Sequence, residues 1–149
     1  PQPQCLAVEF SADAPGSVSL TYALASQLKN EIFFCGDELT IYSGNDDQAT
    51  AIMSLGGKGV ISVLSNVVPG VAHDIVQKYL DGDYIGSREL QLKYLDLCNA
   101  LFMDVNPIPV KEAMNLMGMN VGECRLPLVG LTDEAREKLK ATLKKHGLV

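Results

Sequence analysis

The pattern of apolar and polar positions in the first half of the chain predicts a strand, a short helix and a second strand. Residues 39–42 form an apolar run that ends at a polar turn over residues 43–47. Four apolar side chains then follow at helical spacing: Ala49, Ile52, Met53 and Leu55. A glycine-rich turn at 56–59 ends this helix, and the apolar run 60–63 predicts a buried strand. We therefore expect two adjacent parallel strands, with the helix crossing over one face of the pair.

The second half of the chain predicts only helices. A helix over 68–80 has Pro69 in its first turn, and a longer helix follows over 84–102. A third helix is expected from the proline-rich entry at residues 106–109 through Met117, and a last helix begins after Thr132, which suits an N-cap. The expected buried side chains are Val71, Ile75, Val76 and Tyr79, then Leu90, Tyr94, Leu97 and Leu101, and finally Ala135, Leu139 and Leu143.

These elements divide the chain into three parts. Residues 1–37 are the least coherent part, a candidate for part of a strand-helix unit with a strand over 5–8 and a helix over 19–29. Ile32 to Cys35 within them is either a short strand or a hydrophobic plug. Residues 38–82 hold the predicted strand-helix units, and residues 83–149 hold three consecutive helices. The fold class is therefore α/β, with a small parallel sheet followed by helices.

Composition excludes several function classes. At 149 residues with 47% hydrophobic residues, the chain can bury a core as one domain. A net charge of -6 leaves no basic stripe for phosphates, so nucleic acid is not an expected partner. No apolar run is long enough for a membrane span, and Pro1 to Gln4 lack the features of a signal peptide.

The cysteines and histidines predict neither disulfides nor a metal site. The four cysteines are widely spaced, without a CxxC pair, and only two histidines are present. Reduced thiols in a cytoplasmic protein are the expected state. We expect no metal and no cofactor.

The chemistry is expected where the two predicted strands end. In parallel α/β folds the functional groups gather at the carboxyl ends of the strands. Here those ends are Ser43-Gly44-Asn45 and the residues after Val63. Asp46 and Asp47 are interpreted as helix caps, not as catalytic acids.

Five separated motifs carry a resemblance to a known family. They are YSGNDD at 42–47, LGGKGVISV at 55–63, NVVP at 66–69, NPIPVK at 106–111 and RLPL at 125–128. In this order they resemble the carboxyl-terminal half of the dihydrodipicolinate synthases, from about Gly36 to Val149. NPIPVK and RLPL favour the synthases over the related N-acetylneuraminate lyases. The resemblance implies the carboxyl-terminal part of a TIM (β/α)8 barrel followed by a three-helix extension, and hence a truncated chain.

The resemblance also implies a lyase reaction of lysine biosynthesis. In this family pyruvate forms a Schiff base with a lysine, and the resulting enamine attacks aspartate semialdehyde; no separate cofactor is needed. The implied partners are these two substrates and either further copies of the chain, as a homo-oligomer, or a complementing chain. Two alternatives stay open: another pyruvate-dependent aldolase of the superfamily, and a non-catalytic half-barrel that assembles with a partner.

Residue by residue, the resemblance assigns a substrate pocket without its nucleophile. Ser43, Gly44 and Ile61 match family positions that border pyruvate. The position of the Schiff-base lysine falls on Ser19 by the family's spacing, or on Glu9 if an insertion is allowed. We therefore expect no catalytic lysine in this chain. The remaining candidates are not expected to replace it, since Lys58 precedes its strand, Lys111 lies within a helix and His73 lies on a helix surface.

Overall fold

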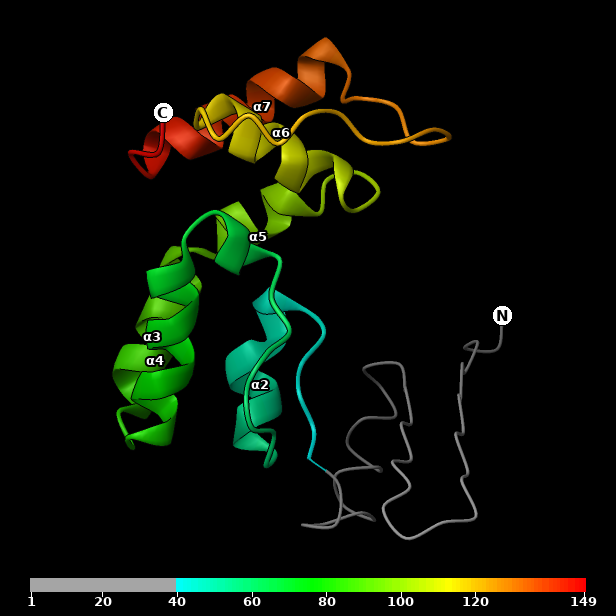
Figure 1. Ribbon diagram of the computed structural model, residues 1–149. Coiled ribbons are helices and arrows are strands. Elements are labelled where there is room, and N and C mark those ends of the chain that lie inside the picture. Colours follow the sequence, from blue (N-terminus) through cyan, green and yellow to red (C-terminus); the bar gives the residue numbers. More distant parts are fainter. Residues whose placement is uncertain (1–39) are drawn as a thin grey trace, which may run out of the picture. The chain divides into compact units, whose positions relative to one another are not determined.

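The computed structural model describes residues 40–149, and the predictions made for residues 1–37 lie outside this described range. Figure 1 shows the order of its elements. These elements are η2 (Asp46–Gln48), α2 (Ala49–Ser54), η3 (Leu64–Asn66), α3 (Pro69–Leu80), α4 (Tyr84–Lys93), α5 (Leu95–Leu101), α6 (Ile108–Leu116) and α7 (Asp133–Lys145).

The two predicted parallel strands are reduced to a single pairing in the described residues. Ser43 and Val60 form one isolated parallel bridge, and no longer strand is present from residue 40 onward. The direction of pairing was predicted correctly, but the extent of the strands was not. The backbone N–H groups of Val63 and Leu64 donate to a carboxylate instead of to a neighbouring strand, so the second extended segment ends early.

Helix α3 confirms the predicted helix over 68–80, and it forms a hairpin with α4. They pack side by side and are joined by the turn at 81–83 (Figure 1). Asp83 caps α4 by accepting a hydrogen bond from the Gly86 amide at 2.9 Å. The buried Ser87 hydroxyl donates to the Ile75 carbonyl at 2.6 Å, which ties the two helices together in their interior. Of the predicted stripe on α3, only Ile75 is buried, whereas Val71, Val76 and Tyr79 are half-buried.

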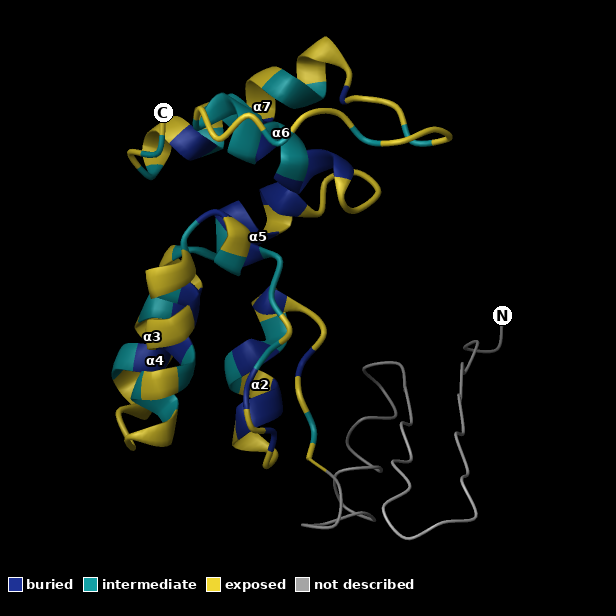
Figure 2. Cartoon of the chain, viewed as in Figure 1, coloured by how far each residue is buried: buried dark blue, intermediate teal, exposed yellow. Residues whose placement is uncertain are grey.

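The main core lies between α5, α6 and α7. Figure 2 shows buried segments on all three helices, and each pair of these helices is in contact. The fully buried side chains here are Leu97, Leu101, Ala113, Leu139 and Leu143. Thr132 caps α7 as predicted, since its Oγ1 accepts from the Ala135 amide at 3.3 Å. None of the helices in the described range is long and apolar enough to cross a membrane.

The long helix predicted over 84–102 is wrong in one respect, because it breaks at Tyr94. The backbone of Tyr94 leaves the helical region at φ -104° and ψ 8°, which separates α4 from α5. The described range therefore holds four helices after residue 83 instead of three. The Tyr94 ring stacks on His146 with centroids 4.8 Å apart, so the break coincides with a contact to a distant helix end.

The end of α7 is held against the start of α5 by an ionic cluster around Asp96. Its carboxylate accepts from Lys145 Nζ at 2.7 Å and from His146 Nε2 at 2.9 Å. The Lys145 ammonium, together with the His146 imidazole, lowers the pKa of Asp96 from 3.8 to about 2, although burial opposes this shift. Because the Asp96 side chain remains 38% exposed, solvent screens these attractions and their contribution to stability is modest.

Candidate functional site

The candidate site is built on Ser43, where the two extended segments pair. The Ser43 amide donates to the Gly59 carbonyl, and the Ile61 amide donates to the Ser43 carbonyl, both at 2.8 Å. The Ser43 side chain is buried, and its hydroxyl donates to the Asn45 carbonyl at 2.8 Å. The polar groups of Ser43 therefore form hydrogen bonds within the turn and to the second segment.

Gly44 leaves open space at the edge of this pairing. A Cβ atom placed on Gly44 would meet no heavy atom within 4 Å, and the residue is exposed. Within residues 40–149 its amide has no hydrogen-bond acceptor. A small ligand could thus approach the backbone closely at this position.

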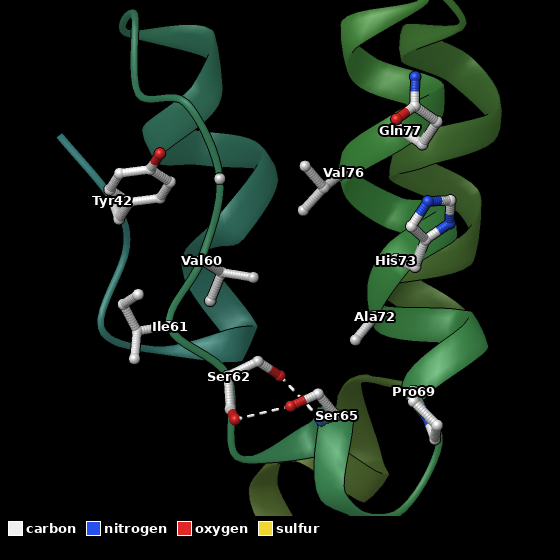
Figure 3. A pocket seen from close by; sticks show the side chains of 11 residues that line it. Tyr42, Val60, Ile61, Ser62, Ser65, Pro69, Ala72, His73, Val76 and Gln77 are labelled. Atoms are coloured by element: carbon white, nitrogen blue, oxygen red, sulfur yellow. Dashed lines mark hydrogen bonds between the residues drawn. The ribbon is translucent and has the colours of Figure 1, made fainter. Parts of the chain in front are cut away.

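Ile61 lies next to this edge and beside a groove. Its side chain is 71% exposed, so in the described residues it is not a packed strand isoleucine. A groove of about 480 Å³ runs between the segment at 59–62 and α3 (Figure 3). Its lining is Tyr42, Gly59, Val60, Ile61, Ser62, Ser65, Pro69, Ala72, His73, Val76 and Gln77. The structure thus brings Ser43, Gly44 and Ile61 together, while their contact with a substrate remains a prediction.

The sequence interpretation of Asp46 as a helix cap is wrong. Asn45 occupies the N-cap position of η2 and makes no side-chain cap bond, while the Asp46 carboxylate lies buried. Its Oδ2 accepts from the amides of Val63 and Leu64, both at 2.9 Å. An aspartate in a polar turn looks the same for both roles, because the amides that donate to it lie far along the chain.

Gln91 is a residue that the sequence reasoning missed. This side chain of α4 is only 3% exposed, and its Nε2 donates to the Asp46 carbonyl. Its Oε1 accepts from the Thr50 amide at 3.1 Å. The available signal for its burial was its place on the predicted helix, because a residue three positions before Tyr94 lies beside it on the helix surface. Glutamine on a helix is usually solvated, so this signal was weak.

No lysine lines the groove among the described residues. The Lys111 ammonium donates to the Glu123 carbonyl at 2.6 Å, and Lys58 is exposed before the second extended segment. His73 is exposed on α3, as predicted, and pairs with Asp74 at 3.1 Å, although it also lines the groove. Within residues 40–149 no three histidine, cysteine or acidic side chains lie close enough together to hold a metal ion.

Comparison with known proteins matches this geometry to one family. The model of the dihydrodipicolinate synthetase family matches residues 14–146, which extends the resemblance upstream of Gly36. The 4-hydroxy-tetrahydrodipicolinate synthase of Acetivibrio thermocellus is 48% identical over 142 residues, which is 95% of this chain and 49% of that protein.

Solved structures of the same family share the arrangement of the helices. The dihydrodipicolinate synthase of Thermotoga maritima superposes with a TM-score of 0.79 at 39% identity, over 83% of this chain and 43% of the other. The enzyme of Acinetobacter baumannii, solved as a complex with pyruvate, gives a TM-score of 0.78 at 35% identity. This match covers 83% of this chain and 43% of the other. These neighbours are TIM barrels, and this chain matches their carboxyl-terminal portion.

The chain spans about half the length of the curated relatives that it matches. The match to the family model nevertheless covers most of the chain, and the identity to relatives is about 50%. The chain therefore belongs to the dihydrodipicolinate synthetase family.

Proposed function

We propose that this chain forms one wall of the substrate site of a 4-hydroxy-tetrahydrodipicolinate synthase. That enzyme condenses pyruvate, held as a Schiff base, with aspartate semialdehyde. The observation that carries the proposal is the pairing of Ser43 with Gly59 and Ile61, because it sets the two segments parallel, so that their carboxyl ends point toward the same edge. The pyruvate complex of the Acinetobacter baumannii relative supports pyruvate as the ligand.

In this proposal the three site residues shape the pocket instead of performing the chemistry. Ser43 fixes the turn, Gly44 presents a backbone amide in open space, and Ile61 borders the site from the second segment. Schiff-base formation needs a neutral lysine amine, which attacks the keto carbon of pyruvate and releases water. We propose that this lysine is absent from the chain, since the expected positions hold Ser19 or Glu9.

Assembly is the other part of the proposal. Several large apolar side chains in the described part of the chain are exposed, including Leu126, Val129, Ile85 and Val105. Their exposure supports further contacts, either with copies of the chain or with a complementing chain. A cytoplasmic location, like the choice between these partners, stays a prediction.

Trapping with pyruvate and borohydride tests the assignment of the nucleophile. Borohydride reduces a lysine–pyruvate imine to a stable amine, so the intact mass of the protein reports the adduct. We expect no adduct on the chain alone. A chimera in which residues 42–149 replace the corresponding part of the Acetivibrio thermocellus synthase should form one adduct per chain and turn over both substrates. An adduct on the isolated chain would show that one of its own lysines is the nucleophile, and a folded but inactive chimera would contradict the proposed wall.

Gly44→Val in the same chimera tests the pocket edge. The valine side chain would occupy the space that a ligand needs, so we expect kcat/KM for pyruvate to fall about tenfold or more, a loss of about 1.4 kcal/mol or more. Gly130→Val is the matched control, because Gly130 is likewise exposed with no heavy atom within 4 Å of its Cβ position. Equal steady-state kinetics for the two variants would remove Gly44 from the site.

A further inference from the structure

A buried amide on α4 connects the carboxyl-terminal helices to the turn that borders the candidate site. Gln91 donates to the Asp46 carbonyl and accepts from the Thr50 amide at 3.1 Å. These partners lie 45 and 41 positions away along the chain. Since Thr50 lies in the first turn of α2, Gln91 satisfies an amide that has no partner inside the helix.

Asp46 continues the connection to the second extended segment. Its carboxylate accepts two backbone hydrogen bonds, from Val63 and Leu64, directly after the segment that carries Ile61. Hydrogen bonds to an ionised acceptor are stronger than neutral ones, and Asp46 is 4% exposed. The turn is therefore joined to this segment twice, through the backbone of Ser43 and through the side chain of Asp46.

Four backbone groups of this connection bond to the side chains of Gln91 and Asp46. Within residues 40–149 no buried side-chain nitrogen or oxygen lacks a hydrogen-bond partner. Removing Gln91 would leave the Thr50 amide without its partner and the Asp46 carbonyl with the Ala49 amide alone. Removing the Asp46 carboxylate would leave the amides of Val63 and Leu64 without their acceptor. Neither residue lines the groove, so neither is placed to touch a ligand there.

We propose that Gln91 and Asp46 are positioning residues, through which α4 sets the placement of Gly44 relative to Ile61. The importance of that placement for pyruvate rests on the proposed function. Displacements of about 1 Å at a substrate site can cost as much as about 10²-fold in activity, so a buried tether at this point controls the geometry of the site from outside it.

The test uses the full chain, labelled with ¹⁵N, and four variants. Gln91→Met removes both hydrogen bonds of the amide, whereas Glu89→Met places the same side chain at an exposed position of α4. Asp46→Leu removes the acceptor, whereas Asp46→Asn keeps an oxygen that can accept from both amides. We expect the amide resonances of Gly44 and Ile61 to shift in Gln91→Met and Asp46→Leu, to stay in Glu89→Met, and to be restored in Asp46→Asn.

Pyruvate binding provides the second readout, measured as shifts of the same two amides on titration with sodium pyruvate. We expect the dissociation constant to rise at least about tenfold in Gln91→Met and Asp46→Leu, and to stay near the parent value in Asp46→Asn and Glu89→Met. Unmoved Gly44 and Ile61 resonances in folded Gln91→Met and Asp46→Leu would overturn the positioning role. If the parent chain does not respond to pyruvate, this wall does not bind pyruvate by itself, and the activity of the chimera described above decides the proposed function. The resonances without ligand then decide whether α4 positions the turn.

Discussion

Replacing Leu139 by alanine is expected to lower the free energy of unfolding of this chain by about 2–5 kcal/mol. Leu139 lies on α7, is 0% exposed, and packs in the cluster that joins α5, α6 and α7. Truncation removes apolar surface from the core and leaves a cavity that the surrounding helices only partly fill. Urea unfolding followed by far-UV circular dichroism measures the change.

Two further variants show whether this loss comes from the core. Leu126→Ala removes the same atoms from a side chain that is 86% exposed, and we expect a change within about 0.5 kcal/mol. Leu139→Met conserves volume and should cost less than about 1.5 kcal/mol. A similar urea midpoint for Leu139→Ala and Leu126→Ala would mean that α7 does not pack on the core as described.

The second large effect concerns the reactivity of Cys98. Burial, reinforced by the charges of Asp46 and Asp47, raises the pKa of the Cys98 thiol from 9.0 to about 12. Because the thiolate is the reactive form, its fraction at pH 8 falls about a thousandfold. We therefore expect native Cys98 to be alkylated by iodoacetamide at least about a thousandfold more slowly than an ordinary exposed thiol.

Peptide mapping by mass spectrometry separates this residue from the other thiols. Cys124 is only half-buried and serves as the internal comparison within the same molecule. Both should react alike once the chain is unfolded in urea. Native labelling of Cys98 as fast as that of Cys124 would show that α5 opens readily or that the thiol is not buried.

Cys98 is connected to the candidate site through Asp46, whose charge acts on the pKa of the Cys98 thiol. The same buried carboxylate that holds Val63 and Leu64 raises the pKa of this thiol through its charge. The environment of α5 is thus electrostatically linked to the turn next to Gly44.

The local pattern of the sequence was sufficient for most of the helices. Pro69 and Thr132 begin α3 and α7 as predicted, and Leu139 and Leu143 face the core. Such features depend on neighbours within about one helical turn, so spacing and capping residues reveal them. The motifs between residues 42 and 128 likewise indicated the family, which the match over residues 14–146 confirms.

Other features were decided only by tertiary structure. The break at Tyr94 is hidden because the apolar spacing continues through it, while its contact with His146 comes from the far end of the chain. The extent of the strands was overestimated, since an apolar run does not reveal whether its amides will find a neighbouring strand.

The sequence by itself thus indicated most of the helices and the family, and Ser43, Gly44 and Ile61 stay its prediction for the edge of the candidate site. The tertiary structure decided how that edge is held. Asp46 meets its partners 17 and 18 positions away, and Gln91 meets Asp46 across 45 positions. The physical reason is that a buried hydrogen bond depends on which groups the folded chain leaves without water, and no local pattern of residues specifies that.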